Sequence, residues 1–145
     1  MDKFWLKEYP AGVPAEIDAD RYGSLKALIE ESLRTHAART AYIQMDHRVG
    51  YAEIDRLSAA FGAWLQQRGL VPGDRIAIML PNLLQYPVAM FGALRAGLVV
   101  VNTNPLYTPE ELKHQLVDSG ATTIVILENF CHVLQKVLVD TPVKN

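Results

Sequence analysis

The chain has 145 residues, of which 50% are hydrophobic and 21% are charged, and its formal net charge is −2. This length suffices for one domain with a hydrophobic core, and the composition excludes a disordered or fibrous protein. Because 14 basic side chains are offset by 16 acidic ones, no excess positive charge is available for phosphate contacts, which argues against a nucleic-acid-binding protein.

The amino-terminal stretch MDKFWLKEYP has charges on both sides of a short apolar patch, and no run of about 18 apolar residues occurs anywhere. Cys131 is the single cysteine, so an internal disulfide is impossible and a reducing compartment is favoured. We therefore expect a cytoplasmic protein. Trp5, between Lys3 and Lys7, is a weak indication of contact with a lipid surface.

Residues 1–23 are expected to form an extended amino-terminal arm lying over the domain, because Pro10, Gly12 and Pro14 interrupt any regular element. Residues 24–145 are expected to form an α/β subdomain. It begins with a helix that Ser24 caps.

Two short strands are predicted within TAYIQMDHRVGY, joined by a tight turn at Asp46–His47. An apolar stripe then predicts a helix over Tyr51–Arg68, and the apolar run after VPGD predicts a buried strand over Ile76–Leu80. A helix is expected over Leu83–Ala96, with Asn82 as its cap and a bend at Pro87, whose ring removes one N–H donor.

Another strand is predicted over Leu98–Val101, then a helix over Pro109–Ser119, a strand over Thr123–Leu127 and a further helix from Phe130. Strands that alternate with helices through short connections indicate a parallel sheet with right-handed crossovers. The fold class predicted is therefore α/β, with a mainly parallel sheet flanked by helices.

The stretch NTNPLYTPEEL raises a structural and a functional question. Thr108 and Glu111 have the spacing of a capping box, with Pro109 at the first helical position and Tyr107 and Leu112 placed as a hydrophobic staple. Asn102 and Asn104 follow a buried strand at the sheet edge where ligands bind in open α/β folds, but such amides also satisfy turn backbone. We take Asn82, Asn102 and Asn104 as candidate residues of a substrate cleft, and we expect Asn102 and Asn104 to serve the turn.

The sequence supplies no catalytic, nucleotide-binding or metal-binding motif of its own. It contains neither a GxGxxG nor a GxxxxGK[ST] pattern, and it has no GxSxG elbow. Cys131 and His132 are adjacent but have no second pair at the spacing of a metal site. We therefore assign no residue to catalysis, to nucleotide or to metal.

Three stretches, PAGVPAEIDADRYGSL, GDRIAIMLPNLLQYPVAMFGALRAGLVVVNTNPLYTPEELKHQLVDSGA and IVIL, resemble the start of bacterial long-chain fatty-acid–CoA ligases, members of the adenylate-forming acyl-CoA synthetase superfamily. The resemblance runs from about Phe4 to Leu138, and LPNLLQYPVA with VNTNPLYTP points to the long-chain enzymes in particular. It implies that the chain is the first part of a longer ligase, inactive alone, because the family's phosphate loop and catalytic lysine lie beyond Asn145.

The resemblance also implies substrates, cofactors and partners for the full-length enzyme. ATP with Mg activates a fatty acid to an acyl-adenylate, and coenzyme A then displaces AMP to give the thioester. This part of the chain alone is expected to bind neither ATP, Mg nor coenzyme A. Peripheral contact with the inner membrane and a homodimer are further implications. The residues themselves leave an alternative open, a stand-alone α/β binding or interaction module with a concave site at the strand ends. A complete flavodoxin-like enzyme is disfavoured because no acid–base constellation is present.

Overall fold

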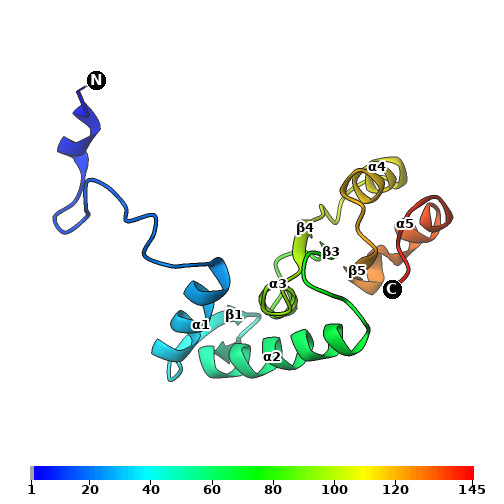
Figure 1. Ribbon diagram of the computed structural model, residues 1–145, viewed down its shortest axis with the longest axis horizontal. Helices are drawn as coiled ribbons and strands as arrows, with labels where there is room; N and C mark the ends of the chain where they lie inside the picture. Colours follow the sequence, from blue (N-terminus) through cyan, green and yellow to red (C-terminus); the bar gives the residue numbers. More distant parts are fainter. Residues whose placement is uncertain (1) are drawn as a thin grey trace.

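The computed structural model describes residues 2–145 and shows an amino-terminal segment followed by an α/β unit (Figure 1). The elements, in chain order, are η1 (Phe4–Glu8), α1 (Leu25–Thr35), β1 (Thr40–Gln44), β2 (His47–Gly50), α2 (Tyr51–Gln67), β3 (Arg75–Met79), α3 (Gln85–Arg95), β4 (Val99–Asn102), α4 (Pro109–Ser119), β5 (Thr123–Ile126), η2 (Glu128–Phe130), α5 (Cys131–Gln135) and η3 (Leu138–Asp140).

The amino-terminal segment does not pack on the rest of the chain as the sequence led us to expect. It projects away from α1 (Figure 1), and none of the residues of η1 is buried. Phe4 is 74% exposed, and its ring contacts Trp5 edge to face with ring centroids 5.4 Å apart. The expected burial was wrong because the apolar side chains of this segment, separated by turns, form no continuous face to cover the domain.

The first helix and the hairpin follow the predicted order. The Ser24 hydroxyl accepts a hydrogen bond from the Ala27 N–H at 3.0 Å, which confirms the predicted cap of α1. β1 and β2 pair antiparallel with Gln44 opposite His47, so the turn consists of Met45 and Asp46, one residue earlier than predicted. Both turn residues have positive φ, 46° and 64°, because the two-residue turn that matches strand twist requires it.

The predicted parallel sheet is confirmed. β3 lies between β4 and β5 and runs parallel to both, with Ile76 opposite Val100 on one side and Thr123 on the other. From Ile76 to Met79 the side chains of β3 are completely buried. A central parallel strand is covered on both faces, which explains the unbroken apolar run in its sequence.

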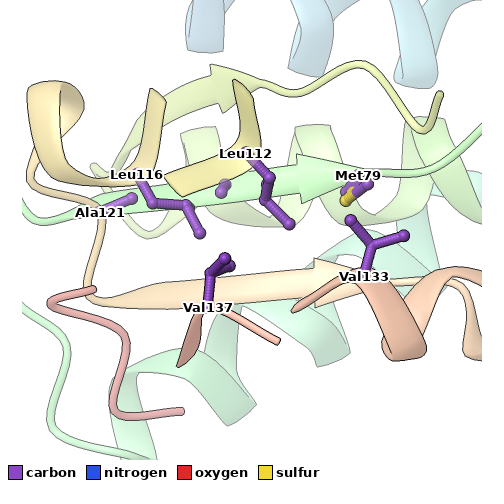
Figure 2. Packing of buried hydrophobic residues seen from close by; sticks show 7 residues of the cluster. Met79, Leu112, Leu116, Ala121, Val133 and Val137 are labelled. Atoms are coloured by element: carbon purple, nitrogen blue, oxygen red, sulfur yellow. The ribbon is translucent and has the colours of Figure 1, made fainter. Parts of the chain in front are cut away.

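Each face of the sheet has its own core. On one face, α4 and α5 cover β3, and the side chains point toward one another between them (Figure 2). On the other face, α2 and α3 cover the sheet (Figure 1). The first cluster consists of Ala77, Met79, Leu112, Leu116, Ala121, Val133 and Val137. The second face buries Leu65, Ile76, Ile78, Ala89, Ala93 and Leu98.

α2 and α3 cross in close contact at two glycines. A Cβ built on Gly62 would lie 2.8 Å from the Gly92 carbonyl oxygen, and one on Gly92 would lie 2.9 Å from the Ser58 carbonyl oxygen. Only glycine allows the two backbones to approach this closely. Beside this crossing the Arg95 guanidinium donates to the Ser58 hydroxyl at 2.9 Å, which joins the same two helices.

The start of α3 differs from the prediction. Asn82 is not its cap: the helix begins at Gln85, its N-cap residue is Leu84, and the Leu84 side chain makes no capping hydrogen bond. Pro87 is therefore the third helical residue, where an N–H has no intrahelical partner in any α-helix. The predicted loss of a hydrogen bond and the bend at Pro87 both followed from placing the helix start two residues too early.

α4 matches the prediction in bounds and in capping. The Thr108 hydroxyl accepts from the Glu111 N–H at 3.4 Å, and the Glu111 carboxylate accepts from the Thr108 N–H at 2.8 Å. Gly120 ends the helix in the left-handed region with φ of 65°. Among the helices of residues 2–145, none has both the length and the apolar character needed to cross a membrane.

Candidate functional site

A mostly apolar groove lies at the carboxyl ends of β3 and β5, beside the tip of the β1–β2 hairpin. It consists of two adjoining cavities of about 650 Å³ and about 320 Å³, which share Gln44, Leu83 and Leu84. The carboxyl edge of a parallel sheet is the position where open α/β folds bind ligands. The larger cavity is lined by Gln44, Met45, His47, Leu80, Leu83, Leu84, Gln85, Val125, Ile126, Leu127 and Glu128. The smaller one is lined by Tyr42, Ile43, Gln44, Asn82, Leu83, Leu84, Tyr86, Pro87 and Met90.

The hairpin is held against the groove by one hydrogen bond between distant parts of the chain. The Gln44 Oε1 atom accepts from the Leu84 backbone N–H at 3.1 Å. Leu84 precedes the first residue of α3, so this amide is one of the four N–H groups that a helix start leaves without an intrahelical partner. The Gln44 side chain thus satisfies an N–H group at the start of α3, as the side chain of an N-cap residue does in other helices.

Sequence reasoning missed Gln44 and the hairpin tip as parts of this site. Met45 is 93% exposed and occupies a positive-φ turn position, which is uncommon for a side chain of its size. The only signal in the sequence was a polar residue at the end of a predicted strand. The pairing of Gln44 with a loop 40 positions away depends on tertiary structure, and no local pattern predicts it.

Asn82 is the one predicted site residue that the structure places in the groove. Its side chain is exposed, and it lines the smaller cavity together with Tyr42 and Tyr86. Burial raises the pKa of the Tyr42 hydroxyl, and the nearby Tyr51 raises it further, so Tyr42 stays uncharged at neutral pH. The smaller cavity therefore offers amide and phenol groups, but no charged side chain among the described residues that line it.

Asn102 lies at the end of β4 and is engaged on both its side chain and its backbone. Its Oδ1 atom accepts from the Tyr86 hydroxyl at 2.6 Å, and its carbonyl oxygen accepts from Gln115 Nε2 at 3.0 Å. Tyr86 also lines the smaller cavity, so Asn102 is connected to the groove through Tyr86. Neither Asn102 nor Asn104 is among the described residues that line the two cavities.

Asn104 organises its own turn. Its Oδ1 atom accepts from the Leu106 N–H at 3.0 Å, and its carbonyl oxygen accepts from the Tyr107 N–H at 3.2 Å. This is an Asx turn, in which a side-chain oxygen satisfies backbone two residues ahead. The three candidate residues therefore do not form one cluster, and Asn82 alone lines the cavity. Asn104 stabilises its turn as expected, whereas the expectation was wrong for the Asn102 side chain, which bonds to Tyr86 and not to turn backbone.

The part of the chain that the structure describes contains no preformed site for a metal ion. Within residues 2–145 no three His, Cys, Asp or Glu side chains are grouped so that they could hold a metal ion. The site as it stands is a recess with mostly apolar walls, a few amide and hydroxyl groups and, in the larger cavity, the side chains of His47 and Glu128. Such a recess suits contact with an apolar group or a chain segment.

The fold places the chain among α/β units with a parallel sheet, and its groove lies at the edge where open α/β folds bind ligands. A family model described as AMP-binding enzyme matches residues 29–144, which is most of the chain. The chain belongs to the AMP-binding enzyme family. The predicted resemblance to adenylate-forming enzymes is thereby confirmed.

The relatives are more specific than the family. The chain is 56% identical over 146 residues to a Long-chain-fatty-acid–CoA ligase of Yersinia pestis, covering 100% of this chain and 26% of that protein. It is 47% identical, with the same coverage, to the protein of the same name in Haemophilus influenzae. The chain thus spans about a quarter of the length of the curated relatives it matches.

Solved structures support the same fold. A benzoate CoA ligase from Burkholderia xenovorans aligns with a TM-score of 0.76 and 28% identity, over 82% of this chain and 24% of that one. A long-chain-fatty-acid-CoA ligase from Archaeoglobus fulgidus aligns with a TM-score of 0.78 over 94% of this chain and 29% of that one. At 24% identity the second alignment is informative about the fold alone.

Proposed function

We propose that this chain is the amino-terminal part of an AMP-forming ligase that joins a long-chain fatty acid to coenzyme A. The observation that carries the proposal is the 56% identity, along the whole chain, to a protein named Long-chain-fatty-acid–CoA ligase. Membership of the AMP-binding enzyme family supports ATP as the nucleotide. The activity is that of the longer protein, and we propose that residues 1–145 supply structure and no catalytic group.

The proposed reaction has two steps. A carboxylate oxygen of the fatty acid attacks the α-phosphorus of ATP, forming the acyl-adenylate as the bond to pyrophosphate breaks. The coenzyme A sulfur then attacks the acyl carbon, and AMP leaves with the electron pair of the broken C–O bond. Mg²⁺ would accompany ATP as a phosphate complex, because this ion is commonly held by substrate phosphates and only one or two carboxylates.

For the groove, we propose that it forms one wall of the fatty-acid cleft and that Asn82 is its polar contact. Asn82 is exposed at the carboxyl edge of the sheet and lines a cavity with mostly apolar walls. Asn102 and Asn104 would act indirectly, since their amide oxygens already accept from Tyr86 and Leu106.

An assay of two proteins tests the proposed activity. Fatty-acid-dependent exchange of pyrophosphate into ATP is measured on the full-length protein and on residues 1–145. We expect exchange with long-chain fatty acids from the first and none from the second. A full-length protein inactive toward every fatty acid would overturn the proposed reaction, and exchange by residues 1–145 would overturn the proposal that these residues supply no catalytic group.

A pair of variants in the full-length protein tests the groove. We expect Asn82→Ala to raise KM for the fatty acid while changing Tm by no more than about 1 °C. We expect Asn104→Ala to lower Tm and leave the kinetics of the remaining folded enzyme unchanged, because it removes the turn contact. Unchanged kinetics in Asn82→Ala would show that Asn82 does not contact the fatty acid.

Location and assembly are proposed from the resemblance and from the exposed arm. We propose a cytoplasmic enzyme with peripheral contact to the inner membrane, in which Trp5 and the flanking lysines meet lipid headgroups; Trp5 is 41% exposed. Sedimentation with anionic vesicles should fall in Trp5→Ala if this holds. We also propose a homodimer of the full-length enzyme, which light scattering tests independently.

A further inference from the structure

Two hydrogen bonds determine what the polar groups of the smaller cavity can offer to a ligand. This cavity, of about 320 Å³, is lined mainly by apolar side chains, together with Tyr42, Gln44, Asn82 and Tyr86. Gln44 and Tyr86 each use one polar atom in a hydrogen bond within the protein. What each of them retains for a ligand follows from the donors and acceptors of its side chain.

Tyr86 can only accept a hydrogen bond from a ligand. A phenol has a single O–H donor, and the Tyr86 hydroxyl donates it to the Asn102 Oδ1 atom at 2.6 Å. This distance is typical of an O–H···O bond and shorter than the usual N–H···O range, so the amide oxygen of Asn102, and not its nitrogen, faces Tyr86. The Tyr86 oxygen is therefore an acceptor at the wall of the cavity.

Gln44 has the opposite character. Its partner is the backbone N–H of Leu84, which is always a donor, so the Oε1 atom of Gln44 must be the atom that faces it. The Nε2 group keeps both of its N–H donors, because the bond to Leu84 uses only the oxygen. The cavity thus has one side chain fixed as an acceptor and another that retains donors.

We propose that the smaller cavity is a subsite for an alcohol group carried on an apolar chain. A hydroxyl is both donor and acceptor, so it can donate to the Tyr86 oxygen and accept from Gln44 Nε2. An ester oxygen cannot donate to Tyr86. A carboxylate would also lose its hydration without meeting a cation, since the described residues that line this cavity carry no charge. The apolar walls that hold the chain include Leu83, Leu84 and Met90.

The subsite names a class of substrate for the groove. If the groove is a wall of the fatty-acid cleft, chains that carry a hydroxyl gain contacts that plain alkyl chains do not make. Only this step rests on the proposed function. Asn102 is then a positioning residue, because it does not line the cavity but determines that Tyr86 accepts rather than donates.

Titrations of the full-length protein, isotopically labelled in its methionine methyl groups for NMR, test the subsite. Met90 lines the smaller cavity, Met45 lines the larger one, and Met79 is completely buried, so their signals report on the subsite, its neighbour and the fold. The probes are octanol, the methyl ester of heptanoic acid and octanoate, which are similar in size but differ in donors and charge. We expect the Met90 signal to respond to octanol with a dissociation constant about tenfold lower than for the other two probes.

Two outcomes of these titrations would overturn the subsite: an ester that binds as tightly as octanol, or a Met90 signal that does not respond to octanol. Binding does not depend on catalysis, so the two failures are distinguishable. A protein that binds octanol at Met90 but activates no fatty acid would refute only the ligase. An active ligase whose Met90 signal ignores octanol would refute only the subsite.

Two variants distinguish the assigned acceptor from general packing. Tyr86→Phe removes the oxygen, so we expect it to weaken octanol binding about fivefold or more and to leave the ester unchanged. Asn102→Ala frees the Tyr86 proton, so we expect the ester, which can then accept from Tyr86, to bind about threefold or more tightly. An unchanged Met79 signal verifies folding. If each variant changed octanol and ester binding alike, Tyr86 would contribute packing alone and the subsite would be refuted.

Discussion

Two loops at the same edge of the sheet lead into helices by different means. The loop after β4 is stabilised by its own residues. Asn104 bonds to Leu106, and α4 is capped by Thr108 and Glu111, which lie three positions apart. The loop after β3 has no such local cap, and the amide of Leu84 is satisfied by Gln44 of the hairpin. The first loop is built by neighbours in sequence and the second by neighbours in space.

The difference between the loops supports the proposed position of the cleft. In the loop after β4, the Oδ1 atoms of Asn102 and Asn104 already accept hydrogen bonds. The loop after β3 is joined to the hairpin by the hydrogen bond from Leu84 to Gln44, and residues of both line the groove. At this edge of the sheet we therefore expect ligand binding beside the loop that has fewer local hydrogen bonds, because groups that already bond within the fold are not free to bind a ligand.

The largest expected effect comes from the helix that lacks a local cap. We expect Gly92→Ala to lower the free energy of unfolding by about 2 kcal/mol, because the new methyl group meets the Ser58 carbonyl and the Phe61 ring. This loss would remain after the gain of about 1 kcal/mol that alanine brings to a helix. Urea unfolding followed by circular dichroism measures it.

Gly23→Ala is the matched control, since a Cβ at that position meets no atom within 4 Å. We expect its stability to stay within about 0.5 kcal/mol of the unsubstituted chain. If Gly92→Ala behaved like Gly23→Ala, close packing on α2 would not be what holds α3 in place.

The difference between contacts near in sequence and contacts distant in sequence also explains which elements the sequence predicted correctly. The bounds and cap of α4 were predicted correctly because all the residues that define it lie within a dozen positions. The parallel sheet was predicted because alternation of strands and helices leaves few topologies. The start of α3 was wrong because Asn82 has the right chemistry for a cap, while the group that serves the helix start, Gln44, lies far away in sequence.

The site was predictable only in part for the same reason. The edge of the sheet follows from topology, so Asn82 could be proposed from its place after β3. The hairpin side of the groove could not be proposed, because no pattern in TAYIQMDHRVGY predicts which loop the tip of the hairpin contacts. The projecting arm was also mispredicted, since composition alone does not tell whether an apolar side chain finds a partner within the chain.

The second prediction breaks the contact between the hairpin and the loop after β3. We expect Gln44→Ala to cost about 1.5 kcal/mol, because the partly buried Leu84 amide loses its acceptor. Exchange of amides in the first turn of α3 should rise more than exchange in α4. Gln44→Glu keeps an acceptor oxygen and should stay close to the unsubstituted chain, and an equal loss in both variants would show that the side-chain oxygen is not what matters.

The third prediction tests the locally built loop. We expect Thr108→Ala to lower stability by about 1 kcal/mol, because the Glu111 N–H loses its acceptor and the capping box is broken. Thr108→Ser keeps the hydroxyl and should recover most of the loss. The increase in amide exchange should stay within α4, whereas an equal increase in α3 would mean that the two loops are coupled rather than independent.

The smallest expected effect is a pH dependence of the same capping box. Hydrogen bonds from the Thr108 backbone N–H and, secondarily, from its hydroxyl lower the pKa of Glu111 below its ordinary value of 4.5. Because the pKa in the folded state lies below that in the unfolded state, this contribution to stability is present above the ordinary value. It is lost as the pH falls through the lowered pKa of the folded state.

We therefore compare Tm of the unsubstituted chain and of Glu111→Gln from neutral pH to about pH 3. The unsubstituted chain should be the more stable at neutral pH, and the difference should shrink toward acid pH. Glu110→Gln is the control, because Glu110 lies in the same first turn and shares its interaction with the helix dipole but not the hydrogen bonds with Thr108. A difference that did not shrink on acidification, or one that Glu110→Gln reproduced, would show that the charge of Glu111 stabilises α4 through the dipole alone and that its bonds to Thr108 add nothing.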